Sequence, residues 1–156
     1  MQIGYAYVVA DIIHIGHLRH LQACRGLCDK LIVGVLTDQA TMERKPKPIL
    51  SFDERLKITR ALSFVDVAVK QEDYSPLPNV EQLQPDILFE STSHTIKDLI
   101  KGRKVVKKYG GRLIAMPYYA EQSSSAIKNT ILKNWVYKEE IFPHNALLKG
   151  DTNDKS

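Results

Sequence analysis

The sequence has little of what marks secreted miniproteins, membrane proteins or disordered chains. Its 156 residues include only two cysteines, Cys24 and Cys28, which are too few for a disulfide framework and predict free thiols. The longest aliphatic run, Leu31–Leu36, is far shorter than the roughly 20 apolar residues that a bilayer-spanning helix needs. The first residues lack a basic segment followed by an apolar stretch, so no secretory signal is visible. These absences predict a cytoplasmic protein without a membrane partner.

Neither sign of charge dominates the sequence. Lys and Arg number 22 against 18 Asp and Glu, and the resulting net charge of +4 suits an anionic ligand such as a nucleotide. The basic stretch Lys101–Lys108 has no interleaved aromatic side chains, so a solvated helix face explains it better than nucleic-acid binding. With 44% hydrophobic and 26% charged residues, the composition is that of an ordinary globular protein of one domain.

Short apolar runs alternate along the chain with segments of helical character, which favours a parallel sheet covered by helices. The expected strands lie within Ile3–Ala10, Leu31–Leu36, Val65–Val69, Ile87–Phe89 and Arg112–Met116. The expected helices run over about His17–Leu27, Ser51–Leu62, Pro78–Leu83, Thr95–Tyr109 and Ser123–Tyr137. The pattern predicts a single doubly wound, Rossmann-like α/β domain over residues 1–137, with a sheet of about five parallel strands and a C-terminal extension over 138–156. Ligands of such sheets bind at the carboxyl ends of the strands.

The first expected strand leads into the motif His14-Ile15-Gly16-His17, where a helix begins. Gly16 allows a tight turn and a close approach of an anion to the backbone. The free amides and partial positive charge of a helix N-terminus suit phosphate. Two imidazoles at that point can donate hydrogen bonds to a phosphoryl group as charge develops in a transition state. The motif therefore predicts a phosphate site.

A second candidate follows the last expected strand, where Ser123, Ser124 and Ser125 open a helix and Lys128 lies one turn inside it. Consecutive hydroxyls at a helix start cap the helix and also bind phosphate oxygens. Taken alone, capping is the simpler explanation of these serines.

Together the two motifs resemble the nucleotidyltransferase superfamily with the His-x-Gly-His signature. The sequence is similar above all to its cytidylyltransferases, such as glycerol-3-phosphate cytidylyltransferase and, more closely, the cytidylyltransferase domain of phosphonate biosynthesis. The similarity extends from Tyr5 to about Leu132 and includes Gly34–Asp38, Asp53–Arg55, Phe64–Asp66 and Pro78–Asp86.

The resemblance implies an enzyme that joins CMP from CTP to a small phosphonate or phosphate monoester and releases pyrophosphate. It implies Mg²⁺ as cofactor, and a homodimer with Phe64–Asp66 near the subunit contact. The residues implied in catalysis are His14, His17 and Lys45. Those implied in nucleotide binding are Val9, Ala10, Asp11, Gly16, Ser91, Ser123, Ser124, Ser125 and Lys128, with Asp11 orienting the first loop or a magnesium ion. Those implied in acceptor binding are Arg44, Lys47, Arg55 and Tyr118.

The sequence also departs from the pattern of these enzymes. Val8–Asp11 lacks the glycine of their first loop, and Ser91–His94 stands where many members carry Gly-Asp-Asp-Trp near the nucleotide. Two alternatives therefore remain, an adenylyltransferase of the same superfamily and a non-catalytic nucleotide-binding or regulatory module. The motif also occurs in class I aminoacyl-tRNA synthetases, but this chain is too short for a tRNA-handling body. A metal site on the stripe from His17 to Cys28 is disfavoured, because one straight helix cannot wrap its ligands round an ion.

Overall fold

The computed structural model describes residues 1–119 and 122–136. The chain divides into two units, Met1–Glu121 and Gln122–Ser156, and each is described by itself. The expected C-terminal extension, 138–156, lies outside the described residues. Within them, no helix is both long and apolar enough to cross a bilayer.

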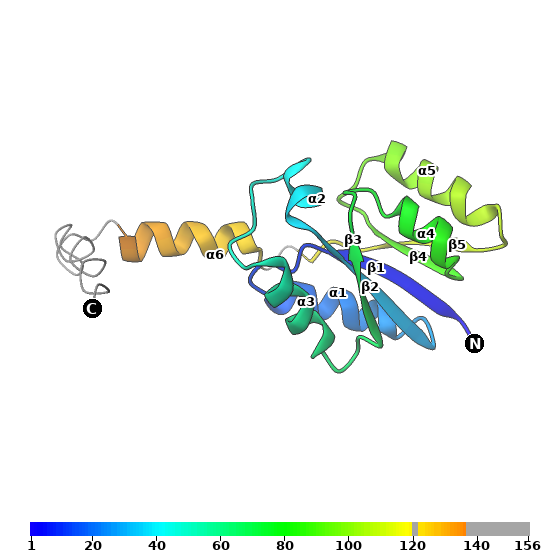
Figure 1. Ribbon diagram of the computed structural model, residues 1–156, viewed down its shortest axis with the longest axis horizontal. Coiled ribbons are helices and arrows are strands. Elements are labelled where there is room, and N and C mark those ends of the chain that lie inside the picture. Colours follow the sequence, from blue (N-terminus) through cyan, green and yellow to red (C-terminus); the bar gives the residue numbers. More distant parts are fainter. Residues whose placement is uncertain (120–121, 137–156) are drawn as a thin grey trace, which may run out of the picture. The chain divides into compact units, whose positions relative to one another are not determined.

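The first unit is built on one sheet of five parallel strands, as the sequence predicts (Figure 1). The strands are β1 (Ile3–Val8), β2 (Lys30–Leu36), β3 (Val67–Gln71), β4 (Ile87–Ser91) and β5 (Arg112–Met116). Their order is β3-β2-β1-β4-β5. The strand order therefore reverses direction at β1, and the crevice between the carboxyl ends of β1 and β4 is where such sheets bind ligands.

Helices cover both faces of the sheet and give two hydrophobic cores. The helices of this unit are α1 (Ile15–Arg25), α2 (Asp38–Met42), α3 (Phe52–Arg60), α4 (Leu77–Leu83) and α5 (Ile96–Lys107). One core joins α1 and α3 to the sheet through Leu21, Val33 and Phe52. The other joins α4 and α5 to the opposite face through Tyr5, Val80 and Val106. Successive residues of β1 therefore belong to different cores, because side chains alternate along a strand.

The middle of the sheet depends on one glycine. A Cβ atom at Gly34 would lie 2.0 Å from the hydroxyl oxygen of Tyr5 and 2.6 Å from Oε1 of Gln71. Those two side chains meet over Gly34, where the Tyr5 hydroxyl donates a 2.6 Å hydrogen bond to Gln71. Gly34 thus makes room for a buried polar contact between β1 and β3.

The predicted elements are found with small shifts at their ends. The third strand begins at Val67 rather than Val65, because the Asp66 carboxylate accepts the main-chain N–H of Leu31 and ends the turn before the strand. The helix α3 begins with a capping box, since Ser51 and Glu54 each accept the other's main-chain N–H. The five-residue helix α2 was not predicted, because it is too short to show a periodic pattern.

The second unit begins with α6 (Ser124–Ile131), which continues into a π-helical turn over Leu132–Val136. Ser123 is its N-cap, and the Ser123 hydroxyl accepts the main-chain N–H of Ala126 at 3.0 Å. The capping role that the sequence predicts for this serine is therefore confirmed.

Candidate functional site

The turn between β1 and α1 has an unusual backbone. Ala10 and Ile12 have φ values of 61° and 55°, in the left-handed region that favours glycine. Ala10 adopts a glycine-like conformation in spite of its Cβ. Each such residue costs of the order of 1–3 kcal/mol and persists only where the surroundings impose it. Contacts from elsewhere in the unit must therefore support this turn.

Asp11 supplies one of these supports. Its two carboxylate oxygens accept the main-chain N–H groups of Ile49 and Leu50, each at 3.0 Å. The side chain is 3% exposed. Asp11 thus ties the first turn to the basic loop that precedes α3, which matches one of the two roles implied for it.

Arg55 supplies the second support, from the first half of α3. Its Nη1 donates to the carbonyls of Val9 at 2.7 Å and Leu36 at 2.6 Å, at the ends of β1 and β2. Its Nε donates to the carbonyl of Leu50, and Nη2 pairs with the Asp38 carboxylate at 2.7 Å. The side chain is fully buried. The structure therefore corrects the expected acceptor contact: Arg55 is enclosed by protein and positions the loops around the site.

The two motif histidines cap α1 reciprocally. His14 is the N-cap and accepts the Gly16 N–H on Nδ1 at 3.0 Å, while His17 Nδ1 accepts the His14 N–H at 3.3 Å. Because each Nδ1 accepts, the neutral ring carries its proton on Nε2. The ring centroids lie 4.0 Å apart. The capping arrangement thus fixes both tautomers and leaves two Nε2–H donors beside the helix N-terminus.

Burial keeps these rings neutral. Desolvation lowers the pKa of His17 to about 4, helped by the neighbouring charges of His14, His20 and Lys45 and opposed by Asp11. Burial also lowers the pKa of His14. The site at neutral pH therefore presents neutral imidazole donors, with cationic charge supplied by other residues.

The basic loop between α2 and α3 provides that charge. Lys45 and Lys47 are exposed, and Lys45 lies close enough to His17 to lower its pKa. Arg44 packs over the Tyr74 ring, 4.6 Å from its centroid, and pairs with Asp98 at 3.5 Å. The charge of Lys45 thus acts on His17, and Arg44 is turned toward the start of α5.

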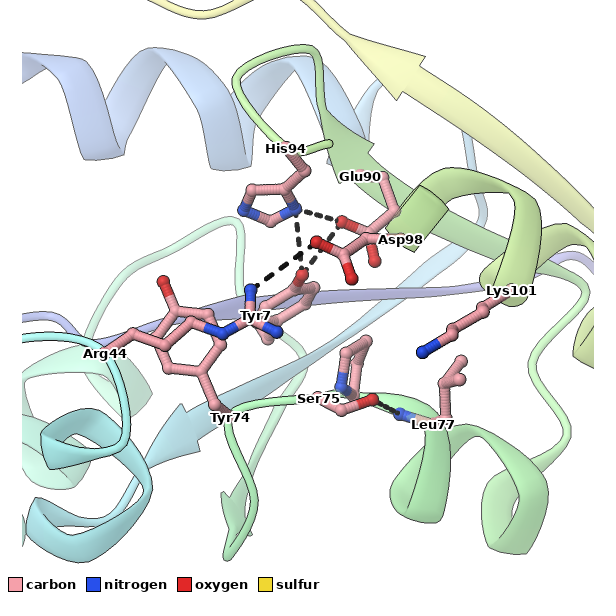
Figure 2. A pocket seen from close by; sticks show the side chains of 10 residues that line it. Tyr7, Arg44, Tyr74, Ser75, Leu77, Glu90, His94, Asp98 and Lys101 are labelled. Atoms are coloured by element: carbon pink, nitrogen blue, oxygen red, sulfur yellow. Dashed lines mark hydrogen bonds and ion pairs between the residues drawn. The ribbon is translucent and has the colours of Figure 1, made fainter. Parts of the chain in front are cut away.

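A pocket lies next to this loop, where β1, β4 and α5 meet (Figure 2). The Glu90 carboxylate is 3% exposed and accepts the Tyr7 hydroxyl at 2.8 Å, while His94 Nδ1 lies 2.5 Å from the same oxygen. Burial and the nearby Glu90 raise the pKa of Tyr7 well above its usual value. The other lining residues are Arg44, Tyr74, Ser75, Pro76, Leu77, Asp98 and Lys101.

Sequence reasoning did not single out Tyr7, Glu90 or His94 as functional residues. One signal was present: Glu90 is a lone acidic residue at the end of an apolar strand, where the sheet binds ligands. Its partners Tyr7 and His94 come from β1 and from the loop after β4, and no spacing in the sequence connects them.

The remaining predicted residues are placed as follows. Ser91 ends β4, and its hydroxyl forms a 2.8 Å hydrogen bond with the Ser93 hydroxyl. Tyr118 follows β5 and has 57% of its surface exposed. Ser124, Ser125 and Lys128 lie on α6 in the second unit, so a phosphate site shared with the histidines stays a prediction.

No group of three or more His, Cys, Asp or Glu residues within 1–119 and 122–136 is arranged to hold a metal ion. On the stripe of α1, the Cys24 sulfur lies 3.9 Å from His20 Nε2. Burial raises the pKa of the Cys24 thiol to about 12, so this cysteine is a protonated core residue at neutral pH.

Comparison with known proteins identifies a family whose members are similar to this chain. The cytidylyltransferase-like family model matches residues 7–130. The bifunctional protein HldE of Citrifermentans bemidjiense is 35% identical over 127 residues, which are 80% of this chain and 26% of that protein. The chain therefore spans about a quarter of the length of the curated relative it matches.

Solved structures share the fold. A lipopolysaccharide core biosynthesis protein from Thermoplasma volcanium matches with a TM-score of 0.67 and 24% identity, over 78% of this chain and 99% of that one. TmcAL of Thermotoga maritima, solved with α-thio ATP, matches with a TM-score of 0.62 and 16% identity, over 85% of this chain and 50% of that one.

Proposed function

The chain belongs to the cytidylyltransferase-like family, and we propose that it transfers a nucleoside monophosphate from a nucleoside triphosphate to a small phosphate or phosphonate monoester. The observation that carries this proposal is the pair of neutral histidines that cap α1. They present two N–H donors at a helix N-terminus beside Lys45, which is an arrangement suited to a phosphate in transfer.

The reaction needs no nucleophile from the protein, because the acceptor is itself an anion. An acceptor oxygen attacks the α-phosphorus, the bond from that phosphorus to the oxygen bridging to the β-phosphate breaks, and pyrophosphate leaves with that oxygen. The Nε2–H groups of His14 and His17 donate to phosphate oxygens as charge shifts toward the leaving group. Lys45 neutralises charge on the phosphates. Catalysis then rests on positioning and charge stabilisation.

Mg²⁺ is part of the proposal as a companion of the triphosphate. The Asp11 carboxylate, one implied magnesium contact, already accepts two main-chain N–H groups. The described residues hold no three-residue group suited to a metal ion. We therefore assign no protein ligand to magnesium, which would arrive on the nucleotide phosphates and neutralise them.

ATP is the nucleotide we favour, although the sequence resemblance implied CTP. The Gly-Asp-Asp-Trp loop of many cytidylyltransferases is absent, and its place is taken by Ser91–His94. In that segment His94 is engaged by Glu90 and Tyr7. The fold relative TmcAL was solved with an ATP analogue. CTP remains the second candidate, because the matching family is described as cytidylyltransferase-like.

The proposal has three further parts, which concern the phosphates, the other contacts with nucleotide and acceptor, and assembly. Ser123, Ser124, Ser125 and Lys128 would hold the β- and γ-phosphates at the start of α6. Ala10, Gly16 and Val9 would line the nucleotide with main-chain groups, and Lys47 and Tyr118 would approach the acceptor. We also expect a homodimer, the oligomeric state that the resemblance implies.

Pyrophosphate release with ATP and CTP in parallel tests the proposal, together with equilibrium binding of each nucleotide. We expect release that depends on an acceptor and is faster with ATP. Faster release with CTP would restore the cytidylyl assignment. Tight nucleotide binding with no release for any phosphate or phosphonate acceptor would favour the regulatory module.

A further inference from the structure

The pocket next to the basic loop between α2 and α3 has an incomplete set of polar contacts. Its deepest polar group is the Glu90 carboxylate, which is 3% exposed. The hydrogen bonds that reach Glu90 from described residues, from Tyr7 and His94, both use Oε2. A carboxylate accepts at two oxygens, so Oε1 is left for a donor that enters the pocket.

We propose that this pocket holds the part of the acceptor that does not react, and that Glu90 selects acceptors carrying a hydroxyl group there. The inference rests on the proposed nucleotidyl transfer and adds to it a specificity-determining residue. Tyr7 and His94 are positioning residues, since they fix the carboxylate from two sides.

The location of the pocket fits this role. Arg44, in the pocket lining, is the neighbour in the chain of Lys45, whose charge acts on His17. On the other side, the charge of His94 acts on His20, one helical turn beyond His17. The pocket therefore borders residues whose charges act on the helix that carries the motif histidines.

The charges of the lining indicate which end of the acceptor lies where. Lys101 projects toward the pocket (Figure 2), and within residues 1–119 and 122–136 no hydrogen bond or ion pair involves its ammonium group. Arg44 and Lys101 together attract the acceptor's phosphate. The ion pair of Arg44 with Asp98 keeps the guanidinium in place for that contact.

The charges of the lining also indicate which chemical group of a small acceptor would contact Glu90. An alkyl group would cover Glu90 Oε1 without replacing its contact with water, and an unmade hydrogen bond at a buried charge is costly. An ammonium group would bond to Glu90 but would lie near the ammonium group of Lys101, while Arg44 is paired with Asp98. A neutral hydroxyl meets neither penalty.

The test compares glycerol 3-phosphate with propyl phosphate, which has the same carbon chain without hydroxyls, and with 3-aminopropyl phosphate. For the unmodified protein with ATP and with CTP, we expect kcat/KM for glycerol 3-phosphate to exceed that for propyl phosphate by about 100-fold. In Glu90→Gln the ratio should fall to about tenfold or less, with the rate for propyl phosphate nearly unchanged. Circular dichroism and nucleotide affinity report whether the variant is folded.

An exposed position gives a second variant that does not risk the core. Lys101→Met should raise KM for all three acceptors by about tenfold with little change in kcat, because a phosphate contact is lost in ground state and transition state alike. Lys108→Met, at the C-cap of the same helix, is the matched control, since Lys108 pairs with Glu81 outside the pocket, and it should change neither constant.

The outcomes separate the two proposals. Nucleotidyl transfer with equal kcat/KM for glycerol 3-phosphate and propyl phosphate would overturn the role of Glu90 and leave the proposed function intact. A preference for 3-aminopropyl phosphate would overturn it as well, in favour of an amine site. Bound nucleotide with no transfer to any acceptor would overturn the proposed function, and this inference with it.

Discussion

The buried guanidinium of Arg55 donates a 2.7 Å hydrogen bond to the main-chain carbonyl of Val9, where β1 ends and the strained turn begins. The same group reaches the end of β2 and the loop before α3. One side chain thus joins three segments that surround the site. A lysine has a single nitrogen and cannot reproduce these divergent contacts.

Arg55→Lys should therefore lower the free energy of unfolding by about 3 kcal/mol, the scale of breaking a buried charged network. It should also lower kcat by about 100-fold, because the turn that carries the histidines is no longer fixed. Urea unfolding and steady-state kinetics measure the two effects. Arg60→Lys on the same helix is the control, and equal losses in both variants would contradict the bracing role.

Asp11→Asn tests the second support of the turn. Asparagine has one acceptor oxygen, so its amide group would face the N–H of Ile49 or Leu50 as a second donor. We expect a loss of about 2 kcal/mol in stability, the scale for hydrogen bonds to a charged group. Hydrogen exchange at the amides of Ile49 and Leu50 should become faster. Asp53→Asn, which affects only an exposed pair with Lys57, should leave that exchange unchanged. Unaltered protection in Asp11→Asn would show that the loop does not depend on this carboxylate.

The sequence predicted local features well and distant contacts poorly. Features that depend on neighbours in the sequence were found by periodicity and capping rules. Examples are the buried strand over Leu31–Leu36 and the helix start at His14 to His17. The role of Arg55 depends on the main-chain carbonyl groups of Val9 and Leu36. Every residue has such a carbonyl group, so no sequence pattern identifies these two as partners of Arg55. The association of Glu90 with Tyr7 likewise depends on which strands become neighbours, a property of the folded sheet.

The lowered pKa of His17 predicts how stability responds to acid. In the unfolded chain this ring titrates near 6.5, but in the folded protein its pKa is about 4. Between these values the unfolded state binds a proton that the folded state does not, so the free energy of unfolding falls as pH drops from 6.5 toward 4. One histidine gives a slope of at most about 1.4 kcal/mol per pH unit. The pKa values of His14 and His20 are lowered too and act in the same direction.

Urea unfolding at half-unit steps from pH 7 to pH 4.5 measures this slope. His17→Gln, which cannot titrate, should give a shallower dependence than the unmodified protein. An unchanged slope in His17→Gln would mean that the ring is protonated in the folded state as easily as in the unfolded chain.

The histidine pair itself is tested by comparing His17→Ala with His20→Ala. His17 directs an Nε2–H donor from the start of α1, whereas His20 lies one turn further into the helix, 3.9 Å from the Cys24 sulfur. Removal of a preorganised donor typically lowers the rate by about 100- to 1000-fold. We expect that loss in kcat for His17→Ala with little change in nucleotide affinity, and less than a tenfold loss for His20→Ala. His17→Gln should recover part of the rate, because an amide N–H can donate where the imidazole did, although it cannot be positioned as rigidly. Equal losses in the two alanine variants, or no loss in either, would show that the transfer step does not depend on this motif.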